Sequence, residues 1–266
     1  MNIYRQFFED VKKYKSYMIC AAKSDLKTEV ADSYLNWIWW ILEPFCLMLV
    51  YTFIFGIIFN KSEAYYPLFI FIGLTLWNFF SANVKKSASM VRRYKSVVSR
   101  VYLPKVVLLF VHMMTTGFKM CVSLAIVVVM MVFFRVPVSY HIVYVIPGMI
   151  VMLLLTFGIM CYEMHYGVYV EDLTKVNDIV MRLLFYLTGI IFNIDQRIGK
   201  NYPALATVLG KCNPMAFLLS SIRNALIYNE TPNWTWMLIW FVISVLLCMG
   251  GVRLVYRNEN NYVKGI

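Results

Sequence analysis

The sequence predicts an all-α integral membrane protein with six transmembrane helices. Hydrophobic residues make up 61% of the 266 residues and charged residues only 15%, which is too little charge to cover a soluble domain of this size. Six long apolar stretches divide the chain, and the basic residues between them fall on alternate connections. Since an apolar helix crosses the hydrocarbon core in about 20 residues, we expect one transmembrane domain over residues 36–266, preceded by a cytosolic or interfacial segment, 1–35.

The six apolar stretches differ in length. The second and fifth are short for a span, and the third is long, so that part of it extends into the cytosol or the helix is tilted. The predicted spans are Trp37 to Phe59, Leu68 to Phe80, Val106 to Phe134, Ile142 to Tyr162, Ile179 to Phe192 and Trp234 to Tyr256.

The distribution of charge predicts the orientation of the chain. The formal net charge of +11 would suit a nucleic-acid partner, but the basic residues gather before the first span, in the 84–105 connection and after the sixth span. The connections after spans one and three carry only Lys61 and Arg135. By the positive-inside rule, both termini and 84–105 lie in the cytosol and the long 193–233 connection lies outside. We therefore expect no nucleic-acid partner.

The N-terminal segment reads as an amphipathic helix. Its first 35 residues are too polar to hold the apolar core of a cleavable signal peptide. A helix of this kind lies among lipid headgroups or packs on the cytosolic surface of its own protein, and both can hold together. The apolar residues at helical spacing are Ile3, Phe7, Phe8, Val11, Tyr14 and Met18.

Tryptophans open the first span. Trp37, Trp39 and Trp40 are typical of an anchor at the membrane–water boundary. Pro44 is expected to kink the entry of the helix. Glu43 beside it is interpreted as a structural acid near the interface.

The 84–105 connection predicts a cytosolic helix with an apolar stripe in basic surroundings. Anionic lipid alone would hold such a helix by its charge. The stripe favours the alternative, a helix that docks on a partner protein. The stripe consists of Val91, Tyr94, Val98 and Val101, and the basic residues around it are Arg92, Arg93, Lys95 and Arg100.

The 193–233 connection predicts two short apolar helices. The second begins at Asn213, with Pro214 at its first helical position. Such helices re-enter the membrane or lie on its outer surface, and irregular backbone at membrane depth must line a cavity or be buried in protein. The segment is therefore a candidate external gate. A seventh span is the alternative, but it would leave the two basic termini on opposite sides.

The sequence offers little catalytic or metal-binding chemistry. It has no GxxxxGK[ST] loop, so we do not expect this chain to bind ATP. His112, His141 and His165 are far apart, and the six cysteines show no CxxC spacing, so no metal site is expected. Lys119 in the third span and Arg182 in the fifth are candidate conduit residues. Lys119 would otherwise snorkel, and Arg182 would pair with Asp178.

Aromatic residues are abundant in three of the spans. Aromatic faces suit the C–H surfaces of sugar rings, although lipid-facing filler is the usual role of a single Phe in a membrane helix. With the two cations, the candidate conduit residues are Tyr51, Phe55, Trp77, Phe80, Lys119, Arg182 and Tyr186.

An ordered set of motifs resembles the type-2 ABC export permeases, and more closely those for polysaccharide or polyol phosphate: the capsule, O-antigen and teichoic acid exporters. SYLNWIWWILEPF at 33–45 and VYTFIFG at 50–56 resemble that family's first span. YPLF at 66–69, Gly73 and LWNFFS at 76–81 resemble its second, and VYLPK at 101–105 the approach to its third. Asp172, Asn213-Pro214 and Arg223 also fall where the family carries such residues.

The resemblance implies a homodimeric, non-enzymatic transport subunit in the bacterial cytoplasmic membrane. Two copies of a separate ATPase would bind ATP and Mg, and a lipid-linked glycan would pass between the protomers. It implies that the N-terminal helix and 84–105, with Arg92, Arg93, Tyr94, Val98 and Arg100, transmit ATP-driven motion. It also implies that the external helices, with Asn213, Pro214 and Arg223, gate the exit.

The sequence departs from the family in three places, and two rival functions stay open. Residues 28–32 lack the usual basic stretch, Glu171 replaces an Arg, and Thr188-Gly189 replaces a Ser-Pro. One rival is a membrane-embedded transferase for lipid-linked sugars, whose candidate groups would be Glu43, Glu163 and His165. The other is a type-2 ABC permease for a small lipid or drug.

Overall fold

Every regular element that the computed structural model describes is a helix. The structure describes residues 3–31, 36–58, 63–95, 103–199 and 201–262. This confirms the all-α prediction.

Five helices in the described residues are long and apolar enough to cross a membrane. They are α3 (Trp39–Tyr51) continued by the π-turn η2 (Thr52–Ile58), α4 (Tyr66–Ala88), α7 (Lys105–Phe133), α8 (Val145–Tyr169) after the turn η3 (Tyr140–Tyr144), and α13 (Trp234–Tyr262). A pair of shorter helices, bent by 90°, raises the number of candidate spans to six. The chain is therefore a multi-pass membrane protein.

Four of the predicted spans had wrong boundaries. The fourth continues past Tyr162 to Tyr169 and the sixth past Tyr256 to Tyr262, and the second and fifth differ as well.

The second span continues past Phe80 to Ala88, because Asn83 is satisfied inside the bundle: its amide nitrogen donates to the Phe79 carbonyl at 2.7 Å and to the Thr116 hydroxyl at 2.8 Å. The 84–105 connection therefore begins as membrane helix.

The fifth predicted span is the 15-residue helix α9 (Leu173–Leu187), which begins before Ile179 and ends before Phe192. Gly189, at a φ of 68°, follows its C-terminal end, and a left-handed glycine is a common helix terminator. By its length α9 falls short of the 18 residues of a complete span.

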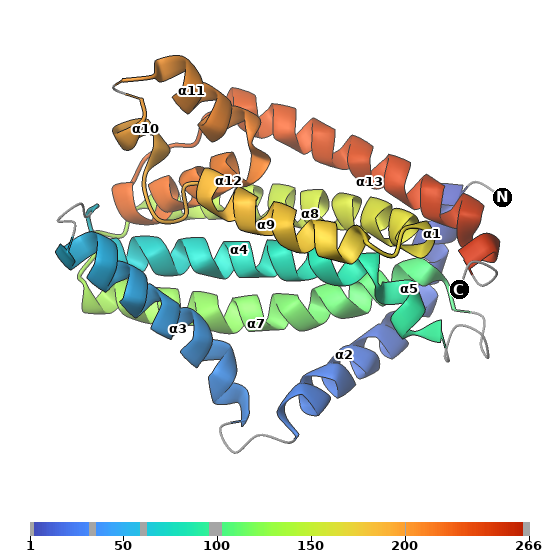
Figure 1. Cartoon of the computed structure of the whole chain (residues 1–266). Coiled ribbons are helices and arrows are strands. Elements are labelled where there is room, and N and C mark those ends of the chain that lie inside the picture. The colour runs from blue at the N-terminus through green and yellow to red at the C-terminus, as the bar shows by residue number, and fades with distance from the viewer. Residues whose placement is uncertain (1–2, 32–35, 59–62, 96–102, 200, 263–266) are drawn as a thin grey trace.

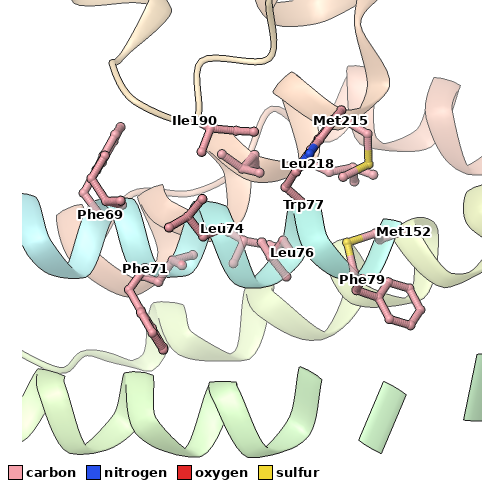
Figure 2. Close-up of a cluster of buried hydrophobic side chains, with 14 of the residues drawn as sticks. Phe69, Phe71, Leu74, Leu76, Trp77, Phe79, Met152, Ile190, Met215 and Leu218 are labelled. Carbon is pink, nitrogen blue, oxygen red and sulfur yellow. The ribbon is translucent and has the colours of Figure 1, made fainter. Parts of the chain in front are cut away.

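The helix α4 is the centre of the bundle. It contacts α3, α7, α8, α9 and α12, and Figure 1 shows it running between α7 and α8. Phe69, Phe71, Leu74 and Leu76 on α4 are almost completely buried, and Figure 2 shows them with Met152 of α8. Because lipid is as apolar as these side chains, close packing holds the helices together.

The N-terminal segment forms two helices, α1 (Ile3–Lys13) and α2 (Lys15–Val30), separated at Tyr14. The predicted apolar face packs on the protein itself: the Phe7 ring lies 6.1 Å from Phe110 of α7 and 6.2 Å from Phe157 of α8. Phe8, by contrast, is 69% exposed. The surface-packing alternative is therefore confirmed, and contact with lipid headgroups stays a prediction.

Candidate translocation and coupling sites

The segment before the last span is a pair of short bent helices, as predicted. After α10 (Ile194–Arg197), α11 (Pro203–Thr207) and the π-turn η4 (Val208–Cys212) make the first arm, and α12 (Pro214–Arg223) with η5 (Asn224–Tyr228) makes the second. The Asn213 side chain accepts hydrogen bonds from the backbone nitrogens of Met215 and Ala216 at 3.1 and 3.3 Å. This N-cap, with Pro214 in the first turn, confirms the predicted helix start.

Arg223 holds this pair to the bundle. Its side chain is 3% exposed, and its three nitrogens donate to carbonyls in two distant segments: Nε to Phe69 at 3.1 Å, Nη1 to Gly189 at 2.8 Å and Nη2 to Ile190 at 2.7 Å. The guanidinium also lies 3.5 Å from the Phe69 ring centroid. Gly73 makes room for it, since an added Cβ would overlap the guanidinium. Arg223 thus joins α12, α4 and the turn after α9.

Four of the predicted conduit residues line one pocket. Tyr51, Trp77, Arg182 and Tyr186 surround a volume of about 230 Å³ between α3, α4 and α9. Phe185, which was not among the predicted conduit residues, also lines this pocket: its ring centroid is 6.1 Å from that of Tyr51 and 6.0 Å from that of Trp77. We call this group the aromatic pocket.

The remaining aromatic candidates lie beside the aromatic pocket. The Phe55 ring is 6.4 Å from Tyr51, and the Phe80 ring is 5.8 Å from Trp77. Trp77 and Phe80 also line a groove of about 440 Å³ that reaches Asn213 and Pro214. The aromatic candidates and the bent helices therefore meet along one surface.

The two predicted intramembrane cations are placed differently. Arg182 faces the aromatic pocket, but its predicted pair with Asp178 is wrong: Lys85 Nζ lies 3.0 Å from the Asp178 carboxylate instead. Lys119 sits in the middle of α7, where it pairs with Glu29 of α2 and lies 5.4 Å from the Trp40 ring. Lys119 therefore lines a separate pocket.

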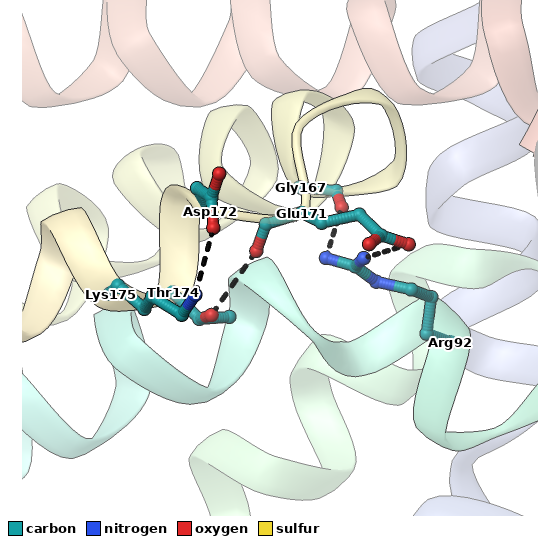
Figure 3. A network of polar contacts seen from close by, with 6 residues as sticks. All are labelled: Arg92, Gly167, Glu171, Asp172, Thr174 and Lys175. Atoms are coloured by element: carbon teal, nitrogen blue, oxygen red, sulfur yellow. Dashed lines mark hydrogen bonds and ion pairs between the residues drawn. The ribbon is translucent and has the colours of Figure 1, made fainter.

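The predicted coupling helix is short and tied to the bundle. The helix α5 (Met90–Arg93) buries Val91 against the protein, so this part of the apolar stripe is not free for a partner. Arg92 donates from Nη2 to the Gly167 carbonyl at 2.9 Å and lies 3.1 Å from Glu171 (Figure 3). Arg93 is exposed. Two further predicted coupling residues, Val98 and Arg100, lie outside the described residues.

Tyr94 links the described part of the predicted coupling helix, residues 90–95, to α2. We call these residues the coupling segment. Its hydroxyl donates to Asp25 at 3.4 Å, and burial, with the nearby Asp25 carboxylate, raises the pKa of Tyr94. The coupling segment is therefore attached to the N-terminal helices on one side and, through Arg92, to the turn between α8 and α9 on the other.

The end of α13 makes several polar contacts that were not predicted from the sequence. Glu259 accepts from the Lys105 backbone nitrogen at 2.9 Å and lies 3.8 Å from its ammonium, with both side chains buried. Tyr256 donates to Asp10 of α1 at 2.9 Å, and His165 lies 2.8 Å from the Tyr262 hydroxyl. Glu259 is the one acidic residue in an otherwise basic C-terminal tail, and this isolation could have indicated a buried ion pair.

The candidate transferase groups do not form a single site. Glu163 accepts from Asn177 at 2.6 Å, His165 is bonded to Tyr262, and Glu43 lines the Lys119 pocket between α3, α4 and α7. Among the described residues there is no group of three or more His, Cys, Asp or Glu side chains that could hold a metal ion.

Comparison with known proteins assigns the family. The structure is a bundle of candidate membrane spans with the short helix α5 toward one end and the bent helix pair α11–α12 toward the other (Figure 1). The family model described as ABC-2 type transporter matches residues 17–227, and the chain belongs to this family. Membership implies an ABC transporter in which a separate ATPase works with this transport component.

Three curated relatives cover almost the whole chain. An O-antigen export system permease protein RfbA from Myxococcus xanthus is 21% identical over 257 residues, which are 97% of this chain and 98% of the relative. Two proteins of the same name from Klebsiella pneumoniae are 23% and 22% identical over 245 residues, 90% of this chain and 92% of each relative.

Proposed function

We propose that this chain is the permease subunit of an ABC exporter that moves a lipid-linked polysaccharide or polyol-phosphate polymer across the bacterial cytoplasmic membrane. The observation that carries the proposal is the end-to-end similarity to permeases named for O-antigen export. The aromatic pocket supports it, because its aromatic rings offer flat faces on which sugar rings can stack.

The proposed exporter contains two copies of this chain. The helix α9 exposes apolar residues along one face, among them Ile179, Leu183 and Tyr186. Leu49 on α3 and Phe53 on its continuation η2 are also exposed. The aromatic pocket lies between these two helices. A second copy seated on α3 and α9 would cover both faces and enclose the pocket as a conduit.

The energy for transport would come from two copies of the partner ATPase, which bind ATP and Mg. Both termini and the coupling segment would face the cytosol. The contact would use exposed groups near α5, such as Arg93, while Arg92 and Tyr94 would pass motion to the α8–α9 turn and to α2. The bent pair α11–α12 would open and close the outer exit.

Deletion of the chain tests the proposal. Cells without it should accumulate lipid-linked glycan on the cytosolic side of the membrane, and the purified chain in mild detergent should bring an ATPase with it. Normal glycan export in the deletion strain, or transport by the chain without nucleotide, would contradict the proposal. A changed response to a drug with normal glycan export would indicate a small-molecule permease instead.

A further inference from the structure

A polar pocket lies between α3, α4 and α7. It shares one lining residue, Lys85, with the aromatic pocket. Its volume is about 380 Å³, and its walls include Trp40 and Glu43 of α3, Thr75 and Asn78 of α4, and Lys119 of α7. All three helices are candidate spans. Polar groups among membrane-spanning helices are costly, and they commonly mark functional sites.

Several polar side chains of this pocket lack a partner. Thr75 is 3% exposed, and its hydroxyl has no hydrogen-bond partner among the described residues. Glu43, Asn78 and Ser123, on the same walls, form no side-chain hydrogen bond or ion pair with the part of the chain that the structure describes. A buried threonine in a helix usually donates to a carbonyl of its own helix, as Thr156 of α8 does to Met152 at 2.7 Å, but Thr75 does not. An unpaired buried hydroxyl destabilises a folded protein by about 1–3 kcal/mol. A ligand that forms hydrogen bonds with these groups would remove this cost and bind more tightly.

The chemistry of these groups suits a neutral polyol. A carboxylate accepts from hydroxyl groups, while an amide and a hydroxyl both donate and accept. The Trp40 indole adds a flat apolar face, and a sugar ring presents hydroxyls at its edge and C–H groups on its faces.

A phosphate group fits this pocket less well than a sugar. Lys119 is already paired with Glu29, and Lys85, also on the wall, is paired with Asp178. The two cations are therefore neutralised, while the unpaired Glu43 carboxylate would repel an anion.

We propose that the polar pocket binds a hexose ring of the lipid-linked glycan within a single copy of the chain. The proposal rests on the function proposed above and assigns a sugar subsite distinct from the aromatic pocket. Its depth suits a glycan on a lipid carrier: Trp40 belongs to the tryptophan group that opens the first span, and such groups mark the level of the headgroups. Glu43 is exposed, so the pocket is open for entry from the side.

Binding of alkyl hexosides tests the subsite without any transport. The full chain is purified in a sugar-free polyoxyethylene detergent and titrated with octyl glucoside, octyl galactoside and octyl mannoside below their micelle-forming concentrations. Complexes are counted by native mass spectrometry. We expect at least one hexoside to bind and its affinity to fall at least tenfold in Trp40→Ala and in Glu43→Gln. Trp37→Ala, at an exposed indole that does not line the pocket, is the matched control and should bind like the unaltered chain.

A conservative variant guards against misfolding. Thr75→Val keeps the side-chain shape and removes only the unpaired hydroxyl, so the affinity for the hexoside should fall about threefold or more. The melting temperature should stay the same or rise, because an unpaired buried hydroxyl destabilises the free protein. Binding of none of the three hexosides, equal binding of octyl phosphocholine, or an equal loss in Trp37→Ala would overturn the subsite. The binding assay needs neither the ATPase nor export, so the two proposals can fail separately. If the hexosides bind in the expected pattern but the deletion strain exports glycan normally, only the proposed function is refuted.

Discussion

At the residue scale, the backbone contacts of Arg223 matter more than its charge. Its guanidinium reaches the carbonyls of Gly189 and Ile190 in the turn after α9 and that of Phe69 on α4. A guanidinium carries five donors in a fixed fork, so one side chain can hold several carbonyls at once. Any motion of the bent helices as a gate must therefore carry the end of α9 with it or break these bonds.

Loss of the Arg223 side chain should destabilise the protein strongly. Arg223→Met leaves three carbonyls without their donor, at about 1–3 kcal/mol each. At about 2–4 °C per kcal/mol, we expect the melting temperature in detergent to fall by roughly 6–36 °C. Scanning fluorimetry measures it, with Arg182→Gln as control, because Arg182 is exposed and its guanidinium is in no ion pair within the described residues. Equal melting temperatures for the two variants would show that the Arg223 contacts do not hold the fold.

Glu63 should make stability depend on pH. Burial raises the pKa of Glu63, and the attraction of Arg197 and Arg223 and a hydrogen bond with the Gln196 side chain oppose the shift. A group whose pKa is higher in the folded than in the unfolded state stabilises the protein when the pH is below its unfolded pKa, about 4.3 for Glu. This contribution is lost as the pH rises through the pKa of the folded state. Glu63→Gln, which stays neutral, should therefore melt at a higher temperature than the unaltered chain at pH 7.

The same comparison at lower pH isolates the Glu63 proton. The difference in melting temperature between the two proteins should shrink as the pH falls toward 4, because Glu63 then becomes neutral in the unaltered chain. Taking the difference removes the titration of all groups that the two proteins share. A Gln variant that is less stable at pH 7 would mean that the charged carboxylate is favoured by its surroundings.

At the element scale, close helix packing depends on a few glycines. Gly167 at the end of α8 lies against the end of α4, where an added Cβ would overlap the backbone carbonyl of Ala88. The same contact positions Arg92, which donates to the Gly167 carbonyl. The coupling segment is thus fixed by a backbone approach that only glycine allows.

Gly167→Ala should therefore lower stability, although alanine favours helix. We expect a loss of about 1–3 kcal/mol from the steric overlap, read as a lower melting temperature. Gly117→Ala is the matched control, since the nearest atom to its Cβ would be a Phe79 carbon at 3.9 Å, and it should be neutral or stabilising by about 0.5–1 kcal/mol. A Gly167 variant as stable as the Gly117 variant would show that α4 and α8 separate easily.

The elements that the sequence predicted well are those determined locally. The N-cap at Asn213 and the proline after it lie within three residues of the groups they organise, so the helix start was predictable. The end of the second span was not, because apolar periodicity counts Asn83 as a polar interruption, whereas in the fold its amide nitrogen donates to Thr116 of α7. Likewise Arg223 and Lys119 were selected as candidates, but their partners are distant in sequence and only packing identifies them.

At the scale of the whole molecule, the exposed apolar surface of α3 and α9 raises the question of whether a second copy of the chain covers it. Only 11% of the hydrophobic window of α3 is buried within the chain, against 78% of that of α4. Lipid can cover such a surface at no cost, so exposure alone does not require a second copy. The face of α3 and α9 differs from the other exposed faces because it contains the aromatic pocket. If this pocket is part of a conduit, a second copy must close its exposed side.

Photo-crosslinking should locate the second copy. With p-benzoylphenylalanine in place of Leu183, which is 60% exposed on α9, ultraviolet light on intact membranes should join two copies of the chain. Val129, which is 67% exposed on α7, is the matched control and should give no such adduct. In the described residues α7 and α9 each pack on α4 and make at most minor contact with each other. Dimer adducts resolved by denaturing electrophoresis from Leu183 alone would support a conduit enclosed by α3 and α9. Adducts from Val129 alone would move the interface to α7 and leave the aromatic pocket facing lipid.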